Sequence, residues 1–270
     1  MRRFLAALLI LVLALGAAAC GGDDDGDAAD TASTPAAAAD LGLITPGELS
    51  VASDIPFAPF EYTEPGSSEV IGFDVDLMNA IADTLGIEKV TFVKQPFTSI
   101  ILSVQQGRFD MSASGFFITP ERAKQVDFGD PYLSANQSVL VQSDSDITGL
   151  DALEGKTIGV QRGTTGADLA ATVPGATVKR YDLSDDAYNA LAQGRVDAVV
   201  NDLPASAYAA TQKPQLKVVE EVTTNDRYAL VFPKDNPALR DAFNAGLAEI
   251  KANGTYDEVY MKWFGQPPPG

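Results

Sequence analysis

Strand-like and helix-like segments alternate from residue 48 onward, and this alternation restricts the fold more than any other feature of the chain. Short apolar runs predict strands, and apolar residues three or four positions apart predict amphipathic helices. Such alternation is typical of α/β proteins, in which helices flank a mainly parallel sheet. Strands are expected at residues 49–53, 90–94, 111–113, 138–142, 157–161, 198–201, 217–220 and 228–231. Helices are expected at residues 74–85, 184–191, 237–252 and 256–264.

Residues at the ends of these segments support the boundaries. Gly86 is expected to end the first helix, Ser184 to cap the second and Pro237 to open the third. The stretch Gln-Gly-Arg-Phe-Asp at 106–110 recurs as Gln-Gly-Arg-Val-Asp at 193–197. Two interpretations stay open: two lobes built from similar βαβ units, or helix–strand junctions that converged on the same residues.

The N-terminal 44 residues are expected to lie outside the folded part. Residues 1–19 join two arginines to an apolar run and small residues, which is typical of a secretory signal peptide and short for a membrane span. Cys20 follows as in a bacterial lipobox, where the cysteine is lipidated; the alternative is an ordinary signal peptide with an unrelated cysteine. Residues 20–44 are predicted to form a flexible acidic tether, since 21–40 contain no aromatic or large apolar residue.

Composition excludes several classes of function. The formal net charge of −18 argues against nucleic-acid binding. The chain has no histidine and one cysteine, so it cannot form Ser–His or Cys–His nucleophile pairs, histidine metal sites or an internal disulfide. With Cys20 expected to carry the lipid, a thiol nucleophile is also excluded, and no cofactor or metal is expected.

Two segments are candidates for binding a small anion. Thr119-Pro120-Glu121-Arg122 has the residues of a helix start, where free backbone N–H groups attract anions, and Arg122 adds a planar fork that suits a carboxylate. The alternative for Arg122 is a solvated surface charge. The second segment, Gly163-Thr164-Thr165-Gly166, is a turn between an expected strand and a helix from Ala167 onward. It lacks the Lys-Ser/Thr ending of a P-loop, so nucleotide phosphate binding is not indicated.

Residues 48–264 resemble the family 3 extracellular solute-binding proteins, the polar amino-acid receptors of bacterial ABC importers. The motifs that carry the resemblance occur in family order: Ala58-Pro59-Phe60-Glu61-Tyr62, Gly72-Phe73-Asp74-Val75-Asp76-Leu77, Ile118-Thr119-Pro120-Glu121-Arg122, Val126-Asp127-Phe128, Asp130-Pro131-Tyr132, Gly163-Thr164-Thr165-Gly166 and Gly194-Arg195-Val196-Asp197-Ala198 leading to Asp202.

The resemblance implies a two-lobed fold of the type II periplasmic binding proteins, with an amino acid bound between the lobes. Lobe 1 would comprise residues 45–135 and 231–270, and lobe 2 residues 136–230. The protein would be a monomer that is anchored to the outer face of the cell membrane and delivers its ligand to an ABC permease.

The resemblance also implies which residues contact the two charged groups of an amino acid. Arg122 would hold the α-carboxylate, with help from backbone N–H groups near Phe117 and Thr165. Asp202 would hold the α-ammonium together with the carbonyl of Gly115. An alternative for Asp202 is that it caps a helix beginning near Pro204.

The same resemblance assigns three residues to the ligand side chain. Phe57 and Phe97 would sandwich it, and Asp54 would reach its polar end, which favours a cationic or amide side chain. The alternatives are core packing for the two phenylalanines and a turn for Asp54. Gln161 occupies a position where relatives differ, so it is expected to contribute to selectivity.

One residue departs from the family pattern. Phe117 occupies a position commonly held by a Ser or Thr that contacts the ligand. The backbone N–H is retained, but the hydroxyl contact to the ammonium is lost. Either another group replaces it, or the ligand is not an ordinary α-amino acid.

Two other functions are compatible with this scaffold, although a non-enzymatic binding protein is expected. The first is a cyclohexadienyl-type dehydratase, for which Glu61 or Asp54 would be the general acid. The second is a sensory ligand-binding module that acts on a separate receptor chain.

Overall fold

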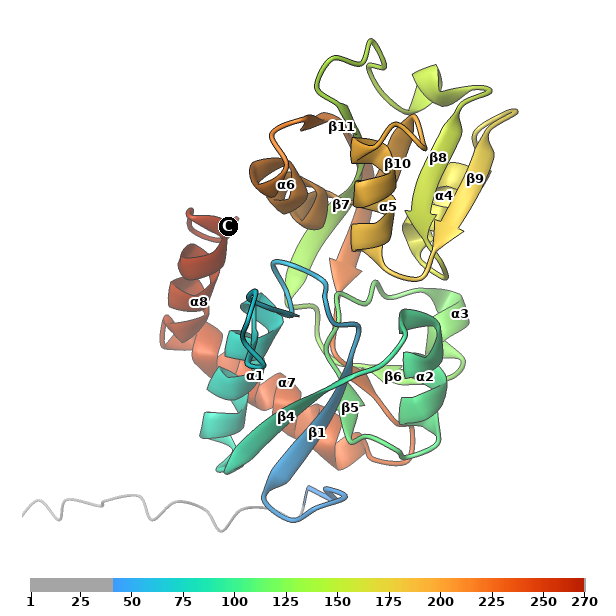
Figure 1. The fold of residues 1–270 in the computed structure, drawn as a ribbon. Helices are drawn as coiled ribbons and strands as arrows, with labels where there is room; N and C mark the ends of the chain where they lie inside the picture. The colour runs from blue at the N-terminus through green and yellow to red at the C-terminus, as the bar shows by residue number, and fades with distance from the viewer. Residues whose placement is uncertain (1–40, 270) are drawn as a thin grey trace, which may run out of the picture. The chain divides into compact units, whose positions relative to one another are not determined.

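The computed structural model describes residues 41–269, so the expected signal peptide, Cys20 and the tether up to residue 40 lie outside the described part. Two five-stranded sheets, each flanked by helices, dominate these residues (Figure 1). We call the first sheet with its helices lobe 1 and the second sheet with its helices lobe 2. A short pair, β2 (Tyr62–Thr63) and β3 (Val70–Ile71), accompanies lobe 1.

In the sheet of lobe 1, β12 runs antiparallel to both of its neighbours and the other four strands share one direction. The order is β4 (Lys89–Lys94), β1 (Glu48–Ser53), β5 (Met111–Ser112), β12 (Val231–Phe232) and β6 (Asp127–Phe128).

The sheet of lobe 2 has the same arrangement, with β7 as the antiparallel strand. The order is β11 (Leu216–Tyr228), β7 (Leu133–Gln142), β10 (Ala198–Asp202), β8 (Thr157–Gln161) and β9 (Thr177–Tyr181). Each sheet is therefore mainly parallel, as the sequence predicts.

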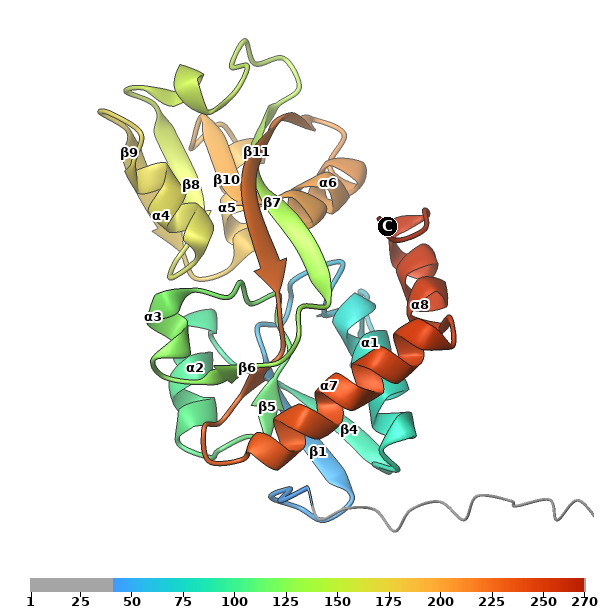
Figure 2. The same ribbon diagram turned by 180° about the vertical axis from the view of Figure 1, so that it is seen from behind.

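Alternation along the strands of lobe 2 supplies an apolar surface on both faces of its sheet. Val139 and Val141 pack with α4 (Thr165–Ala171), whereas Leu140 between them packs with α5 (Ser184–Ala192) and α6 (Leu203–Gln212). This follows from the two-residue period of side chains along a strand. Figures 1 and 2 show α4 on one face of the sheet and α5 and α6 on the other.

Lobe 1 is layered in the same way. Leu49 and Val51 of β1 face the core formed with α1 (Phe73–Thr84), α7 (Pro237–Ala252) and α8 (Thr255–Phe264). Ala52 faces the opposite side, where it packs with α2 (Phe97–Gln105).

The long helix α7 shows how local sequence sets one of these layers. It begins at Pro237, directly after Asn236, whose side chain accepts a hydrogen bond from the backbone N–H of Leu239 at 3.2 Å. Gly246 lies where α7 meets α1, and a Cβ at this position would stand 2.9 Å from Ile81 Cγ2. The glycine therefore permits the close approach of the two helices.

Strands β7 and β11 lie side by side and continue from lobe 2 toward lobe 1 (Figure 2). At the lobe 1 end, the N–H of Tyr132 donates to the carbonyl of Tyr228 at 3.0 Å, and Phe117 forms an isolated bridge with Tyr228. We call the start of β7 and the end of β11, which pass between the lobes, the crossing segments. Tyr228 joins both of them to the chain that precedes Arg122. This junction lies next to the candidate site.

Most expected elements are confirmed, with some differences. The strand expected at 217–220 is longer, and the one expected at 228–231 is divided between the end of β11 and β12. The prediction that Ser184 caps α5 is wrong, because the helix starts at this residue and its side chain makes no capping bond. The helix start expected at Thr119 and Pro120 is confirmed by α3 (Pro120–Ala123), and the helix expected near Pro204 is α6. The sequence analysis missed α2, β2, β3, β6, β9 and the short helix η1 (Leu150–Leu153).

The start of the described chain is not free, although the tether was expected to extend to residue 44. Leu41 and Leu43 pack against the core of lobe 1, and the N–H of Ile44 donates to Asp110 Oδ1 at 2.7 Å. The part of the chain that packs against lobe 1 therefore includes residues 41–44. No helix within residues 41–269 is long and apolar enough to cross a membrane.

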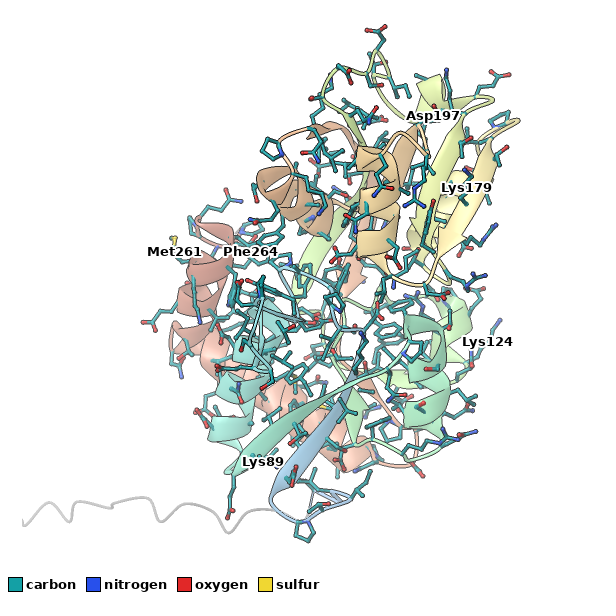
Figure 3. The ribbon with its side chains drawn as sticks, viewed as in Figure 1. Lys89, Lys124, Lys179, Asp197, Met261 and Phe264 are labelled. Atoms are coloured by element: carbon teal, nitrogen blue, oxygen red, sulfur yellow. The ribbon has the colours of Figure 1, made fainter. Side chains whose placement is uncertain are left out.

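Charged side chains extend from the outer surface of both lobes, as Lys89, Lys124, Lys179 and Asp197 illustrate (Figure 3). On α8, by contrast, Met261 is 46% exposed whereas Phe264 packs against Phe73 and Tyr260. Tyr256, Tyr260 and Phe264 recur every four residues and form the side of α8 that packs against the core of lobe 1.

Candidate functional site

All ten residues expected to bind ligand line one pocket between the ends of the two sheets. They come from both lobes, and many follow the carboxyl ends of strands, where open α/β sheets bind ligands. Sequence reasoning missed two further lining residues, Ser114 and Asn201, which precede predicted site residues in the chain. The lining residues are Asp54, Phe57, Phe97, Ser114, Gly115, Phe117, Arg122, Gln161, Thr164, Thr165, Asn201 and Asp202.

Arg122 is presented to the pocket by the expected helix start. Thr119 Oγ1 accepts a hydrogen bond from the backbone N–H of Arg122 at 3.2 Å, and Pro120 is the first residue of α3. The Arg122 guanidinium donates to the carbonyl of Phe117 at 2.8 Å and, across the lobes, to the carbonyl of Gly163 at 3.2 Å. Both acceptors are neutral, so the positive charge keeps its capacity for an anionic partner.

This guanidinium lies beside a stacked pair of aromatic rings. Its Cζ lies 5.5 Å from the ring centre of Phe97 and 5.2 Å from that of Phe116, within range of cation–π attraction. The two rings are themselves stacked, with centroids 4.5 Å apart. The aromatic pair therefore restricts the direction in which Arg122 points, and the interpretation of Arg122 as a solvated surface charge does not apply.

Asp54 lies at the lobe 1 end of the pocket and is 1% exposed. Its Oδ2 accepts a hydrogen bond from Gln161 Nε2 of lobe 2 at 2.5 Å. Its Oδ1 is buried and has no hydrogen-bond partner of normal geometry among residues 41–269, although the backbone N–H of Phe97 is near enough to act against the rise in the pKa of this carboxyl group. Burial raises the pKa of Asp54 to about 6. A buried carboxylate oxygen without a donor creates a demand for a cation or an N–H donor at this end of the pocket.

Asp202 lies on the lobe 2 side and has a partner for each oxygen. Gln137 Nε2 donates to Oδ1 at 2.6 Å, and the hydroxyl of Tyr228 donates to Oδ2 at 2.5 Å. Burial raises the pKa of Asp202 to about 6, and these hydrogen bonds act in the opposite direction. Asp202 occupies the N-cap position of α6, but its side chain makes no capping hydrogen bond. The cap interpretation therefore does not explain its side chain.

Phe57, Phe97 and Phe117 each contact both the pocket and another aromatic ring. Phe57 stacks on Phe60 with centroids 5.3 Å apart, and Phe117 stacks on Tyr228 at 4.5 Å. Core packing and pocket lining are thus not alternatives for these side chains.

Gly115 has a steric and a conformational reason to be glycine. Its φ is +53°, and a Cβ would stand 2.8 Å from Phe57 Cε1 and 3.3 Å from Tyr228 Cζ. A side chain here would displace the ring of Phe57, which lines the pocket, and the ring of Tyr228 behind it.

The two threonines of the lobe 2 turn have different roles. Thr164 is the N-cap of α4, since its Oγ1 accepts from the N–H of Ala167 at 3.1 Å and donates to the carbonyl of Gln161 at 2.9 Å. Thr165 is the first residue of α4, two positions earlier than expected. The first-turn N–H groups of this helix therefore begin at the pocket.

Two further buried carboxyl groups, those of Glu61 and Asp74, lie behind Asp54. Ser114 Oγ accepts from the N–H of Asp54 at 2.9 Å and donates to Glu61 Oε1 at 2.5 Å. Within the described part of the chain, Glu61 Oε2 and Asp74 Oδ1 are buried and have no hydrogen-bond partner of normal geometry. Burial, followed by the charge of Asp74, raises the pKa of Glu61 well above its ordinary value, and burial raises that of Asp74 to about 7.

These acidic groups do not form a metal site. Among residues 41–269, no group of three or more acidic, histidine or cysteine side chains is arranged to hold a metal ion. Burial favours the neutral, protonated forms of Glu61 and Asp74.

The pocket is nearly filled by its own side chains. Its free volume is about 10 Å³, which is room for about one water molecule. A larger cavity of about 880 Å³ lies between α6 and α8, with Tyr208 and Trp263 among its lining residues. The smaller pocket is the better candidate, because Arg122, Asp54 and Asp202 converge on it and no comparable convergence of buried charge lines the larger one.

Comparison with known proteins identifies the family to which this two-lobed chain is similar. Residues 49–266 match the bacterial extracellular solute-binding proteins, family 3. The arginine-binding periplasmic protein of Mannheimia haemolytica is 39% identical over 215 residues, which are 77% of this chain and 88% of that protein.

Solved structures agree with the match to this family. An ancestral arginine-binding protein bound to arginine has a TM-score of 0.78 and 40% identity, covering 81% of this chain and 99% of that one. An ancestral amino acid-binding protein, a precursor of cyclohexadienyl dehydratase, has a TM-score of 0.76 and 37% identity over 81% of this chain and 96% of that one. The expected two-lobed type II fold is confirmed, and the chain belongs to family 3 of the bacterial extracellular solute-binding proteins.

Proposed function

We propose that this protein is the substrate-binding component of an ABC importer and that it binds an amino acid with a cationic side chain, L-arginine first among the candidates. The names of its relatives support the class, since they include arginine-binding proteins from two bacterial species. The choice of a cationic ligand rests on this chain's own pocket.

The observation that carries the proposal is the placement of three charged groups. Arg122 suits the α-carboxylate of the ligand, and Asp202 suits its α-ammonium. Asp54, with its unpartnered Oδ1, suits a guanidinium at the far end of the side chain. Desolvating each charge of an amino acid without a partner is costly, so this constellation favours arginine over neutral amino acids.

The remaining lining residues have secondary roles in this proposal. The rings of Phe57 and Phe97 pack against the aliphatic part of the ligand. The carbonyl of Gly115 accepts from the ammonium, and N–H groups near Phe117 and Thr165 donate to the carboxylate. Gln161 would share Asp54 with the guanidinium, and Thr164 holds the turn.

Binding is proposed to favour an arrangement in which both lobes contact the ligand. Arg122 belongs to lobe 1 and Asp202 to lobe 2, so one zwitterion bridges them. The lobe boundaries in this proposal are residues 45–135 with 231–270, and 136–230. Because the free volume is about 10 Å³, the ligand must enter while the lobes or the lining side chains are displaced.

Export and anchoring belong to the same proposal. The signal peptide of residues 1–19 would direct export, and Cys20 would carry lipid that holds a monomer on the outer face of the membrane. The acidic stretch after Cys20 would serve as a tether, so that the ligand-loaded form stays near the permease.

A second candidate is a dehydratase on the same scaffold, favoured by one observation. Asp54 is a pocket carboxyl group with a pKa of about 6, which is suitable for a general acid near neutral pH. The similarity to a precursor of cyclohexadienyl dehydratase gives this candidate a further reason. Turnover of prephenate or arogenate by the purified protein would establish it, and its absence together with amino-acid binding would eliminate it.

The proposed function is tested by thermal-shift screening of the mature chain against the common amino acids, citrulline and ornithine. The protein is first unfolded and refolded to remove any ligand carried through purification. A saturable rise in melting temperature with arginine, larger than with its neutral isostere citrulline, is expected from mass action. No rise with any amino acid from a cooperatively folded sample would contradict the proposal.

A further inference from the structure

We propose that Tyr228, which is not among the lining residues, is a positioning residue for Asp202 and that Phe117 holds it in place by ring stacking. This inference rests on the proposed function for the identity of the ligand group at Asp202. It accounts for the departure of Phe117 from the family pattern, since a hydroxyl from another part of the chain supports the ammonium subsite.

The contacts of Tyr228 are those of a positioning residue. Its side chain is fully buried, its hydroxyl donates to Asp202 Oδ2 at 2.5 Å, and its ring lies 22° from parallel with Phe117 at a centroid separation of 4.5 Å. On another side, Phe60 meets the ring edge-on at 5.2 Å. The hydroxyl therefore has little freedom to leave Asp202.

Phe117 links this tyrosine to the pocket. Its ring lines the pocket and contacts Tyr228, and its carbonyl accepts from Arg122 at 2.8 Å. Phe117 thus contacts Arg122, which is proposed to bind the ligand carboxylate. It also contacts Tyr228, which holds Asp202, the residue proposed to bind the ammonium. A Ser or Thr here would contact ligand directly but would offer no ring for Tyr228.

The chemistry explains why Asp202 needs this support. Burial favours the neutral acid, which cannot compensate an ammonium, whereas donated hydrogen bonds favour the carboxylate. The Tyr228 hydroxyl is the largest of these opposing influences on the pKa of Asp202, followed by the Gln137 amide. Removing the hydroxyl therefore favours protonation of Asp202.

Other charged and titratable groups also face Asp202. Arg122 of lobe 1 favours its charged form, whereas Asp226 of β11 opposes it. Tyr188 of α5 is influenced by the charge of Asp202, and burial raises the pKa of this tyrosine beyond the range in which it ionises in ordinary buffers. Removing the Tyr228 hydroxyl leaves Arg122, Asp226 and Tyr188 in place, so the change in the surroundings of Asp202 is confined to one hydrogen bond.

The alternative is a purely structural role, in which Tyr228 is only a core residue at the junction of the crossing segments. A Tyr228→Phe variant separates the two possibilities, because it keeps the ring and the stack and removes the hydroxyl. The matched control is Tyr132→Phe. Tyr132 is also buried next to the junction, but its hydroxyl donates to Asp74 Oδ2 at 3.0 Å instead of to Asp202.

The first measurement is a carbon-detected NMR titration of the Asp202 carboxyl group in the ligand-free full chain. We expect Tyr228→Phe to move the Asp202 midpoint to higher pH by about one pH unit, the size expected for one hydrogen bond to a charged group. Tyr132→Phe should leave it in place. An unchanged midpoint in Tyr228→Phe would overturn the proposal, whether or not the protein binds arginine.

The second measurement compares L-arginine with 5-guanidinopentanoate, which lacks only the α-ammonium. Both probes meet Asp54 in the same way, so the ratio of their affinities reports on Asp202 alone. With a midpoint that moves from about 6 to about 7, we expect Tyr228→Phe to reduce this ratio by about threefold near pH 6.5 and to leave it almost unchanged at pH 8, where Asp202 is ionised again. A ratio that changes equally at both pH values would indicate a merely structural role and overturn the proposal.

Phe117→Leu supplies a second variant in case Tyr228→Phe does not fold. It removes the stacked ring without introducing a hydroxyl, and we expect a smaller shift of the Asp202 midpoint in the same direction. If wild-type protein binds neither probe while the NMR shifts occur, the proposed function fails and the role of Tyr228 stands.

Discussion

Replacing Arg122 by alanine tests the carboxylate subsite, the part of the pocket on which the proposed ligand class depends. Within residues 41–269 the guanidinium donates to two neutral carbonyls, at 2.8 and 3.2 Å, and it lies beside two aromatic rings. A bound carboxylate would be its anionic partner, and two parallel hydrogen bonds to the planar fork would make this pairing specific.

The magnitude follows from the cost of leaving one charge of a buried pair alone. Truncating one partner of a buried, hydrogen-bonded charge pair costs about 2–5 kcal/mol of binding. With about 1.4 kcal/mol for each factor of ten, Arg122→Ala should weaken arginine binding by roughly 30-fold to several thousand-fold.

Isothermal titration calorimetry of refolded protein measures this loss directly. Arg122→Lys is the matched control, because it keeps the positive charge but not the fork, and we expect it to fall between wild type and Arg122→Ala. Melting temperatures of the ligand-free variants report whether the contacts to Phe117 and Gly163 matter for folding. A loss below about 1 kcal/mol in Arg122→Ala, from a folded protein, would remove Arg122 from the site.

Three further predictions follow from the buried groups. Asp54→Asn should reduce the preference for arginine over citrulline at pH 7.5 by about tenfold or more, because it removes the charge at the guanidinium end; an unchanged preference in competition calorimetry would place the side chain elsewhere. The pKa values of Glu61 and Asp74 are raised, so their contribution to stability is present at low pH and is lost as the pH rises through the raised values. Glu61→Gln should therefore lessen the fall in ligand-free melting temperature between pH 5 and pH 8, and an equal fall in both proteins would refute this. Gly72→Ala should cost at least about 3 kcal/mol in urea unfolding, since its Cβ would stand 1.9 Å from the Phe60 carbonyl oxygen; Gly66→Ala, with open space around it, should cost only about 1–2 kcal/mol because of its left-handed φ of +84°, and equal costs would contradict the steric argument.

The sequence predicts the architecture well where a local signal is strong. Helix α7 starts at Pro237 and ends at Ala252 as expected, because a capping residue, a proline and a regular apolar period all agree. Thr119 and Pro120 likewise give the start of α3 correctly. The missed helix α2 has no capping side chain and follows Pro96, so it lacks such a signal.

Contacts between distant segments are less accessible to sequence reasoning. The ten expected site residues line one pocket, but they were identified through the family resemblance and not from contacts that the sequence itself reveals. Gln137 was not expected there, and its position opposite Asp202 arises from the register of β7 against β10, which neither strand specifies alone. The role of Tyr228 has the same origin, since this residue lies 111 positions after Phe117 and an isolated bridge between β11 and the chain before α3 brings the two together.

Asp54 and Glu61 illustrate a third kind of limit. Their types and positions are visible in the sequence, but their burial and missing partners are not. These properties decide whether a carboxyl group is an ordinary turn residue or a group with a raised pKa at the end of a binding pocket.

A crystal structure of the refolded protein with L-arginine tests the central claim most directly. We expect the ligand in the pocket of Arg122, Asp202 and Asp54, with its carboxylate on the guanidinium of Arg122, its ammonium on Asp202 and its side chain directed to Asp54. Arginine bound in the larger cavity beside Tyr208 and Trp263, or in the expected pocket with its carboxylate away from Arg122, would contradict the account.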